Sequence, residues 1–263
     1  MATTDVEGSA SLAERQLERH GRSWQSTVGL ALVSWTVLCG FVVAVGWLLT
    51  QPLTGSVGRG DDDLALWIAA RRTPTLDDVA FAGQLVGDTL VGQIGLILIA
   101  VGFSLWQRSV VPAVVVGLVE AGLLGIYLVA GHLIPRDRPP VKVLDPGLDP
   151  SHSFPSGHVA TTTAIYGTLV VLTWTYWRMH RWMAVLLLLP LVAAVARLYQ
   201  GAHHLSDVLT SLVYAPLWLA TVTFLVLWGR GAPGPGRPSL TDAPGERSSG
   251  SVPAAPPAGR RER

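Results

Sequence analysis

The sequence predicts an all-α membrane protein, a bundle of six transmembrane helices with one further helix lying on the extracytoplasmic face of the membrane. Of its 263 residues, 49% are hydrophobic and only 14% are charged, whereas soluble domains carry about 25% charged residues. Six apolar stretches approach the roughly 20 residues that a helix needs to cross a bilayer. These stretches are residues 28–50, 85–106, 110–133, 159–177, 182–199 and 205–228.

The apolar stretches divide the chain into three parts. Residues 1–27 are polar, and the first apolar run is longer and starts later than the core of a signal peptide, so we expect a retained transmembrane helix behind a short cytoplasmic segment. Residues 28–228 form the membrane domain. Residues 229–263 are rich in Pro, Gly, Ser and Arg without periodicity, which predicts a disordered cytoplasmic tail.

The distribution of basic residues predicts the orientation. Arg108 lies in one tight turn between apolar stretches, and Arg178 and Arg181 lie in another. Short loops that carry arginine usually face the cytoplasm. An orientation that places these two turns in the cytoplasm also places most of the 19 basic residues there. We therefore expect a multi-pass protein of the plasma membrane with both termini in the cytoplasm.

The predicted interfacial helix follows the first span. Residues 61–63 are three aspartates, which a helix dipole favours at an N-terminus. An apolar stripe at helical spacing follows, namely Leu64, Trp67 and Ile68. Thr-Pro at 73–74 ends this helix, and Thr-Leu-Asp-Asp at 75–78 resembles a capping box that opens the next one.

Three short polar segments adjoin the predicted spans, all on the extracytoplasmic side. They are Arg-Pro at 138–139, Pro-Ser-Gly-His at 155–158, and the run from Arg197 to Asp207. Together they gather two arginines, two histidines and an aspartate at one membrane face. Such a set indicates a site for an oxyanion that supplies its own nucleophile.

The run from Arg197 to Asp207 contains the candidate nucleophile. His203 and Asp207 are four residues apart, a spacing that places them on one helix face. A carboxylate that accepts the Nδ1 proton of His203 would leave Nε2 free to attack. The turn at 201–202 can fold Arg197 back over this histidine. His204 is an alternative nucleophile, because it is three residues from Asp207 and spacing does not exclude it.

The other two segments supply candidate phosphate ligands. Ser156 and Gly157 precede an apolar helix, where free backbone N–H groups can bind an anion. His158 in the first turn can donate a proton to a leaving oxygen. Arg138 can clamp two phosphate oxygens with its planar guanidinium. The alternatives are an ordinary N-cap for Ser156 and an interfacial arginine that stabilises no ligand for Arg138.

These segments resemble the three-part signature of the type-2 phosphatidic acid phosphatase superfamily, which includes the vanadium haloperoxidases. That signature reads Lys-x6-Arg-Pro, Pro-Ser-Gly-His and Ser-Arg-x5-His-x3-Asp, and the resemblance covers about residues 28–228. The family lysine falls on Gly131 and the serine on Ala196. Three further side chains could replace the charge of the missing lysine, namely His132, Arg136 and Lys142.

The resemblance implies a metal-independent membrane lipid phosphatase without a cofactor. His203 would form a phosphohistidine, Asp207 would orient it, and His158 would act as acid and then base. Arg138, Arg197, Ser156 and Gly157 would hold the phosphate. The substrate would be a lipid in the bilayer, either polyprenyl diphosphate, slightly favoured for a bacterial chain, or phosphatidic acid or phosphatidylglycerophosphate. A net charge of +1 gives no support to nucleic-acid binding, and nothing indicates an oligomeric state.

Two alternatives and one residue stay open. Gly131 in the lysine position favours a weakened lipid-phosphate binding or transport protein of the same fold, and a vanadate-dependent haloperoxidase is the third hypothesis. Glu120 lies in the middle of the third span, where a charge is costly. It is either a structural carboxyl bonded to a neighbouring helix or a functional group.

Overall fold

A computed structural model describes residues 24–177 and 181–228, and its regular elements in these ranges are helices. The predicted cytoplasmic segment before residue 24 and the tail after residue 228 lie outside the described residues. The longer helices are α2 (Trp24–Thr50), α3 (Arg59–Ala69), α4 (Pro74–Leu85), α5 (Thr89–Gln107), α6 (Val111–Leu133), α7 (Gly157–Thr162), α8 (Thr168–Trp177), α9 (Leu189–Tyr199) and α10 (Leu205–Thr223). Short π-helical or 3-10 segments complete them, namely η1 (Thr54–Gly58), η2 (Thr163–Gly167), η3 (Arg181–Leu188) and η4 (Phe224–Trp228).

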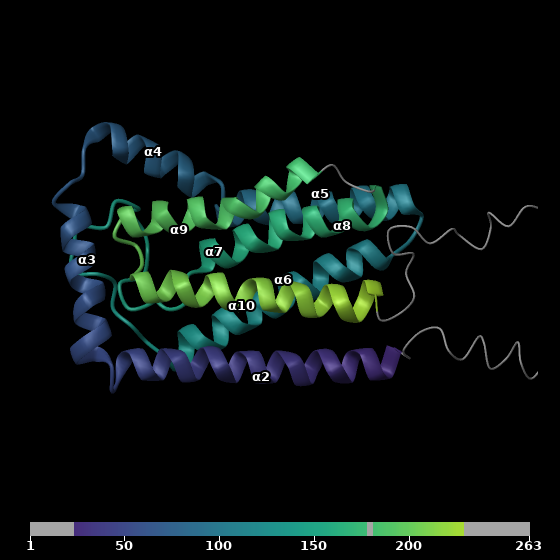
Figure 1. The fold of residues 1–263 in the computed structure, drawn as a ribbon, viewed down its shortest axis with the longest axis horizontal. Coiled ribbons are helices and arrows are strands. Elements are labelled where there is room, and N and C mark those ends of the chain that lie inside the picture. Colours follow the sequence, from purple (N-terminus) through teal and green to yellow (C-terminus); the bar gives the residue numbers. More distant parts are fainter. Residues whose placement is uncertain (1–23, 178–180, 229–263) are drawn as a thin grey trace, which may run out of the picture.

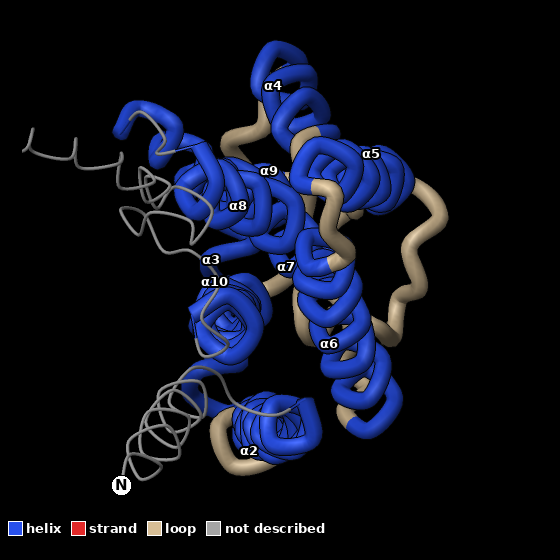
Figure 2. The backbone as a smooth tube through the Cα atoms, turned by 90° about the vertical axis from the view of Figure 1, so that its right-hand side faces the viewer, coloured by secondary structure: helices blue, strands red, loops and turns tan. Residues whose placement is uncertain are grey.

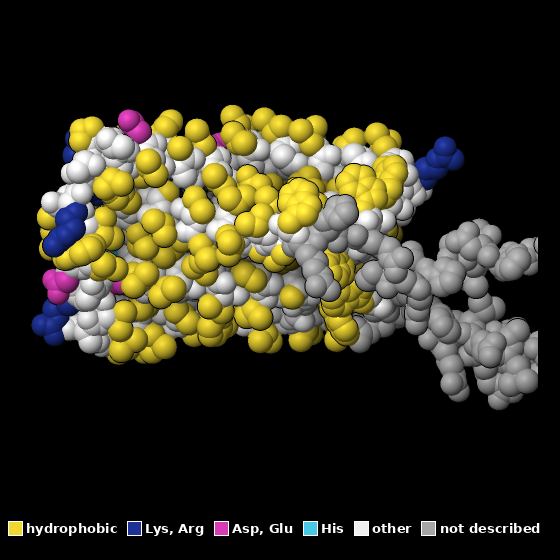
Figure 3. Space-filling view, turned by 45° about the horizontal axis from the view of Figure 1, so that its top comes forward, with side chains coloured by type: hydrophobic (Ala, Val, Ile, Leu, Met, Phe, Trp, Pro, Cys, Tyr) yellow, Lys and Arg dark blue, Asp and Glu magenta, His cyan; other side chains and the backbone are white. Residues whose placement is uncertain are grey.

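Five helical stretches within the described ranges are long and apolar enough to cross a membrane. They are Trp24–Thr50, Pro74–Gln107, Val111–Leu133, Trp182–Tyr199 and Leu205–Trp228. Apolar side chains cover the long sides of the molecule (Figure 3). Exposing an apolar surface of this extent to water would be energetically unfavourable for a monomer, whereas the hydrocarbon chains of a bilayer can cover it. The protein is therefore a helical membrane protein.

The predicted fourth span, 159–177, is present as the continuous run α7, η2 and α8, but it is not among these five stretches. Threonines reduce its apolar character. Their hydroxyls donate to the carbonyls four residues earlier, as Thr163 does to Val159 at 2.9 Å and Thr175 does to Val171 at 2.8 Å. This run packs against α5, α6, α9 and α10, so protein surrounds much of it (Figure 2).

The predicted capping box at 75–78 is wrong. Thr73 is the N-cap of α4, since its hydroxyl accepts the Leu76 N–H at 3.3 Å and Pro74 occupies the first turn. Asp77 instead accepts a hydrogen bond from the Tyr199 hydroxyl at 2.7 Å. The α-helix also breaks within the predicted second span, between α4 and α5, where Asp88 caps α5 by accepting two backbone N–H groups at 3.0 Å.

Helix α6 runs obliquely through the bundle and packs against α2, α5 and α10 (Figures 1 and 2). Its close approach to α10 requires Gly122, because a Cβ at this position would lie 2.2 Å from Nε1 of Trp218. That nitrogen donates to the Leu118 carbonyl at 3.0 Å, and Trp35 of α2 donates to the Gly122 carbonyl at 2.9 Å. Small residues allow backbones to approach closely where membrane helices cross.

One end of the bundle carries the polar connections. Helix α3 lies across this end, at the left of Figure 1. Helix α2 begins and η4 ends at the opposite end. The loop that connects α6 to α7 and the turn that connects α9 to α10 lie beside α3. The three polar segments found in the sequence therefore lie at the same end of the molecule.

We expect Gly122→Ala to destabilise the folded protein by about 1–3 kcal/mol, because the added methyl group displaces the buried Trp218 ring. Gly117→Ala on the same helix is the matched control, since a Cβ there meets nothing within 4 Å. Thermal unfolding of both variants in one detergent measures the difference. Equal melting temperatures would show that the helix crossing tolerates the methyl group.

Candidate active site

A cavity of about 250 Å³ lies between α5, α6, α7 and α9, and it is closed by the connections that carry Arg138 and His203. Its lining includes Arg138, Gly157, His158, Arg197 and His203, together with Tyr127 and several side chains of α5 and α6. Five of the residues predicted from the sequence therefore border one space. They come from α7, from α9 and from the connections at the α3 end of the bundle.

Arg197 brings a buried positive charge to this cavity. Its side chain is fully buried near the end of α9. Nη1 donates to the Asp145 carboxylate at 2.8 Å and to the Gln200 side chain at 2.9 Å. Nε and Nη2 have no hydrogen-bond partner among the described residues. Buried polar groups are normally paired, so this free edge of the guanidinium is suited to bind an anion.

Arg138 provides a second cation and joins two backbone segments. Its Nε donates to the Asp149 carbonyl at 2.8 Å, its Nη2 donates to the His152 carbonyl at 2.9 Å, and its Nη1 donates to the Ala202 carbonyl. Burial lowers the pKa of Arg138, and the positive charge of Arg197 lowers it further. Two guanidinium groups that repel each other across one cavity would both gain from a bound oxyanion.

His203 is held by a backbone carbonyl rather than by the predicted carboxylate. Its Nδ1 lies 2.6 Å from the Ser153 carbonyl oxygen but 3.9 Å from Oδ2 of Asp207, too far for a hydrogen bond. A carbonyl only accepts, so Nδ1 carries the proton and Nε2 of the neutral ring keeps its lone pair. The prediction that Asp207 accepts this proton is wrong in this conformation, although the resulting tautomer is the predicted one.

The surroundings keep the His203 ring neutral. Burial lowers the pKa of His203 to about 3, and the charges of Arg197 and Arg138 act in the same direction. Asp207 and the Ser153 carbonyl oppose this shift without reversing it. An imidazole with this pKa is uncharged at neutral pH and can act as a nucleophile through Nε2.

The turn between Arg197 and His203 depends on Gly201. This residue has a φ of +69°, and a Cβ on it would lie 2.5 Å from Cγ2 of Val141. Glycine therefore satisfies both the left-handed backbone and the close approach. The Ala202 N–H donates to the Arg197 carbonyl at 3.0 Å. The turn brings Arg197 and His203 to the same cavity.

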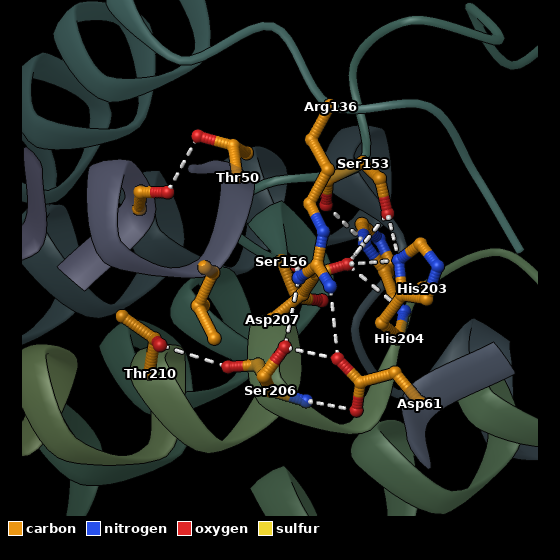
Figure 4. A network of polar contacts seen from close by, with 12 residues as sticks. Thr50, Asp61, Arg136, Ser153, Ser156, His203, His204, Ser206, Asp207 and Thr210 are labelled. Carbon is orange, nitrogen blue, oxygen red and sulfur yellow. Dashed lines mark hydrogen bonds and ion pairs between the residues drawn. The ribbon is translucent and has the colours of Figure 1, made fainter. Parts of the chain in front are cut away.

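Asp207 lies behind the cavity at the centre of a buried polar network (Figure 4). It accepts hydrogen bonds from Nη1 of Arg136, from the Ser153 hydroxyl and from the His204 backbone N–H at 2.9 Å. Arg136 also pairs with Asp61 of α3 at 2.8 Å. The network connects α3, the loop after α6 and the start of α10. Asp207 thus acts on His203 through Ser153, whose hydroxyl it binds and whose carbonyl holds the ring.

His204 belongs to this network and does not line the cavity. It is the N-cap of α10. Its Nε2 lies 3.1 Å from Asp62, and its Nδ1 lies 3.4 Å from both Ser153 Oγ and Asp207 Oδ2. Both ring nitrogens therefore face polar neighbours. This geometry favours His203 over His204 as the nucleophile.

Ser156 lies deeper than expected. Its side chain is fully buried, and its backbone N–H donates to the Ser211 hydroxyl at 2.9 Å. Its own hydroxyl has no partner within the described ranges. Neither group lines the cavity, whereas Gly157 and His158 do. The structure thus places Ser156 outside the lining of this cavity, and its backbone N–H fixes the start of α7 against α10.

The three candidates for the missing lysine charge lie elsewhere. His132 and Lys142 are exposed, and Arg136 is committed to Asp61 and Asp207. None of them lines the cavity that contains His203. Gly131 borders a neighbouring cavity with His152 and Asp149, and a Cβ there would keep ordinary contact distances.

The sequence analysis missed several residues that position the site. Ser153 and Asp145 hold the side chains of His203 and Arg197, and Asp61 closes the buried network. Ser153 lies two positions before the Pro-Ser-Gly-His segment, which was the one available signal. Asp145 was one of many loop aspartates, and its pairing with Arg197 depends on the fold. In the described part of the chain, no group of three or more His, Cys, Asp or Glu residues could hold a metal ion.

The fold and the cavity define a membrane protein whose site suits a phosphate-like oxyanion. Residues 112–230 match the family model of the PAP2 superfamily. The chain also resembles a solved structure described as the first transmembrane PAP2-type phosphatidylglycerolphosphate phosphatase from Bacillus subtilis. The two share 21% sequence identity with a TM-score of 0.60, over 73% of this chain and 93% of the other. No curated protein sequence matches the chain.

We expect Arg136→Gln to lower the free energy of unfolding by about 3 kcal/mol or more, because it leaves Asp207 and Asp61 buried without a cation. Arg59→Gln is the control, since Arg59 is exposed and binds only the Gly55 carbonyl of its own segment. Chemical denaturation in detergent compares the two. If both variants matched the wild type, the network would not stabilise the fold.

The low pKa of His203 predicts a pH-dependent stability. The unfolded chain protonates this ring near pH 6.5, whereas the folded protein resists down to about pH 3. The unfolded state therefore binds more protons between these values, and stability falls as the pH drops below 6.5, by at most about 1.4 kcal/mol per pH unit.

We therefore expect the melting temperature of His203→Gln to fall less between pH 7 and pH 5 than that of His132→Gln, whose side chain is exposed. Differential scanning fluorimetry in a single detergent measures both variants. An equal fall in the two would mean that His203 takes up a proton in the folded protein.

Proposed function

We propose that this protein is a membrane lipid phosphatase that transfers the phosphoryl group of a lipid phosphate or diphosphate to His203 and then to water. The observation that carries the proposal is the unpartnered edge of the buried Arg197, which borders the same cavity as the free Nε2 of His203. An oxyanion between Arg197 and Arg138 would place its phosphorus before this nitrogen. The match of residues 112–230 to the PAP2 superfamily model supports the same chemistry.

In the first step, Nε2 of His203 attacks phosphorus while the bond from phosphorus to the leaving oxygen breaks. His158, in the first turn of α7 and in the wall of the cavity, donates its proton to that oxygen. In the second step, His158 takes a proton from water, the water oxygen attacks the phosphohistidine, and the bond from nitrogen to phosphorus breaks. Inorganic phosphate leaves and both histidines return to their starting states.

Arg138, Arg197 and the Gly157 N–H would stabilise the charge on the equatorial oxygens of the transition state. Their positions are fixed before substrate binds, because Arg138 is bonded to three carbonyls and Arg197 to Asp145. Preorganised donors of this kind supply most of the catalysis in phosphoryl transfer. We propose turnover without a metal ion, with the two guanidinium groups providing the positive charge.

We propose that six helices cross the plasma membrane, the sixth being the run α7, η2 and α8, and that both termini are cytoplasmic. Helix α3 would then lie at the extracytoplasmic interface over the active site. The positive-inside distribution of arginines supports this orientation. The substrate would present its phosphate at this interface while its chains remain in the bilayer.

The alternative is a lipid-phosphate binding or transport protein, which Gly131 at the family lysine position favours. Both proteins would bind the phosphate, but only an enzyme forms a covalent phosphohistidine. The intermediate therefore separates the two hypotheses.

The experiment is phosphate release in detergent with a chelator present, from phosphatidic acid, phosphatidylglycerophosphate and a polyprenyl diphosphate. We expect wild-type turnover and its loss in His203→Ala by about three to six orders of magnitude, since the covalent route is removed. His204→Ala is the matched control, and we expect it to retain about a tenth of the activity or more because its ring lies outside the cavity.

Acid quenching during turnover should trap labelled phosphate on the wild-type protein and on His204→Ala but not on His203→Ala. Wild-type protein that binds these lipids without releasing phosphate would support the binding protein. Activity that requires added magnesium would contradict metal-independent turnover.

A further inference from the structure

The active-site cavity has a second polar wall that the proposed chemistry does not use. Gln93 of α5 and Glu120 of α6 line it, together with Thr161 of α7. Glu120 precedes the end of α6 at Leu133 by thirteen residues, which corresponds to about 20 Å along the helix. The arginines belong to the polar end of the bundle, so Glu120 marks the end of the cavity that points into the membrane.

Only one of the two carboxyl oxygens of Glu120 has a hydrogen-bond partner among the described residues. Nε2 of Gln93 donates to its Oε1. Its Oε2 has no hydrogen-bond partner in the part of the chain that the structure describes. A carboxyl group within a membrane helix is costly and normally faces a partner or a cavity. Glu120 contacts a partner, Gln93, through Oε1 and also lines the cavity. Its Oε2 is therefore available to a ligand in the cavity.

The cavity can hold a phosphate group together with only part of the lipid that carries it. Its volume of about 250 Å³ lies below the range of about 300–1,000 Å³ that accommodates drug-sized ligands. A phosphate between Arg138 and Arg197 therefore leaves room for only the first few atoms of the group to which it is bonded. Those atoms would face Glu120, Gln93 and Thr161.

The chemistry of this wall selects among substrates. An ionised carboxylate accepts hydrogen bonds and cannot donate them. A hydroxyl group near the phosphate can donate to Oε2 of Glu120. A second phosphate group at the same place offers acceptors and negative charge, and a hydrocarbon chain leaves the carboxylate unpaired. The two ends of the cavity therefore complement a phosphate joined to a hydroxyl-bearing carbon chain.

We propose that Glu120, positioned by Gln93, determines substrate specificity and selects lipid phosphate monoesters with a free hydroxyl close to the phosphate. This inference rests on the proposed phosphatase function. It reverses the slight preference for polyprenyl diphosphate that the sequence suggested.

The test uses two substrates that differ by one hydroxyl group. Lysophosphatidic acid has a free hydroxyl on the carbon next to the phosphate-bearing carbon, and the acyloxypropyl phosphate of the same chain length lacks it. We expect wild type to show a kcat/KM for lysophosphatidic acid at least about tenfold higher, which corresponds to the loss of one hydrogen bond. Farnesyl diphosphate serves as the third substrate and should be the poorest.

Glu120→Leu should bring the ratio of the two monoesters close to one while activity on the acyloxypropyl phosphate persists, and it should raise the relative rate on farnesyl diphosphate. Glu120→Gln has the same shape and an acceptor oxygen, so it should keep part of the hydroxyl preference and lose the discrimination against the diphosphate. Thr221→Val is the control, because Thr221 bonds only the Leu217 carbonyl outside the cavity.

Each outcome has a distinct meaning. A wild-type ratio near one, or a ratio that Glu120→Leu leaves unchanged, overturns the specificity role and leaves the phosphatase intact. An absence of phosphate release from every lipid overturns the proposed function, and the inference with it. If Glu120→Leu does not fold, the ratios of Glu120→Gln decide, since a purely structural carboxyl would lower activity on all three substrates equally.

Discussion

The buried carboxylate of Asp207 is the constraint on which the site depends. A fully buried charge must be compensated by cations and hydrogen bonds, and here the compensation comes from segments far apart in the sequence. Arg136 comes from the loop after α6, Ser153 comes from the segment before α7, and the His204 N–H opens α10. Asp61 extends the network to α3 by pairing with the same arginine. Satisfying one aspartate thus assembles the end of the bundle that carries the cavity.

This network and the cavity share a single link, Ser153. Its hydroxyl donates to Asp207, and its carbonyl accepts the proton on Nδ1 of His203. The carboxylate therefore orients the His203 ring through the backbone and not through a direct bond. A carbonyl fixes the tautomer as well as a carboxylate would, but it brings no negative charge into contact with the ring. Burial and two nearby guanidinium groups then keep the ring neutral.

The wall of the cavity contains charged groups with atoms that lack hydrogen-bond partners among the described residues. In the described part of the chain, two nitrogens of the buried Arg197 have no partner. Burial and the nearby charge of Arg197 both lower the pKa of Arg138. At the other end, Glu120 offers a carboxylate oxygen without a partner. Such unsatisfied groups cost free energy in the empty protein. A ligand with an anionic group at one end and a hydrogen-bond donor near it would recover that cost. The groups that we propose to bind the phosphate and to select the substrate are therefore the ones that lack partners.

The sequence alone determined the membrane class, the positions of five spanning stretches and the three segments that line the site, because apolar length and short motifs are local properties. It also identified Gly201 as part of a turn that returns Arg197 to the histidine.

Only the tertiary structure decided which groups touch. The carboxylate partner of His203 and the cap of α4 were predicted from spacing. The structure instead places the Ser153 carbonyl against His203 and makes Thr73 the cap of α4. Arg136 was predicted to stand in for a lysine at the phosphate, but the nearest buried anions are Asp207 and Asp61, and a guanidinium binds the charge that the fold buries beside it. Glu120 was left open because only the fold shows that its carboxyl group faces the cavity that contains His203.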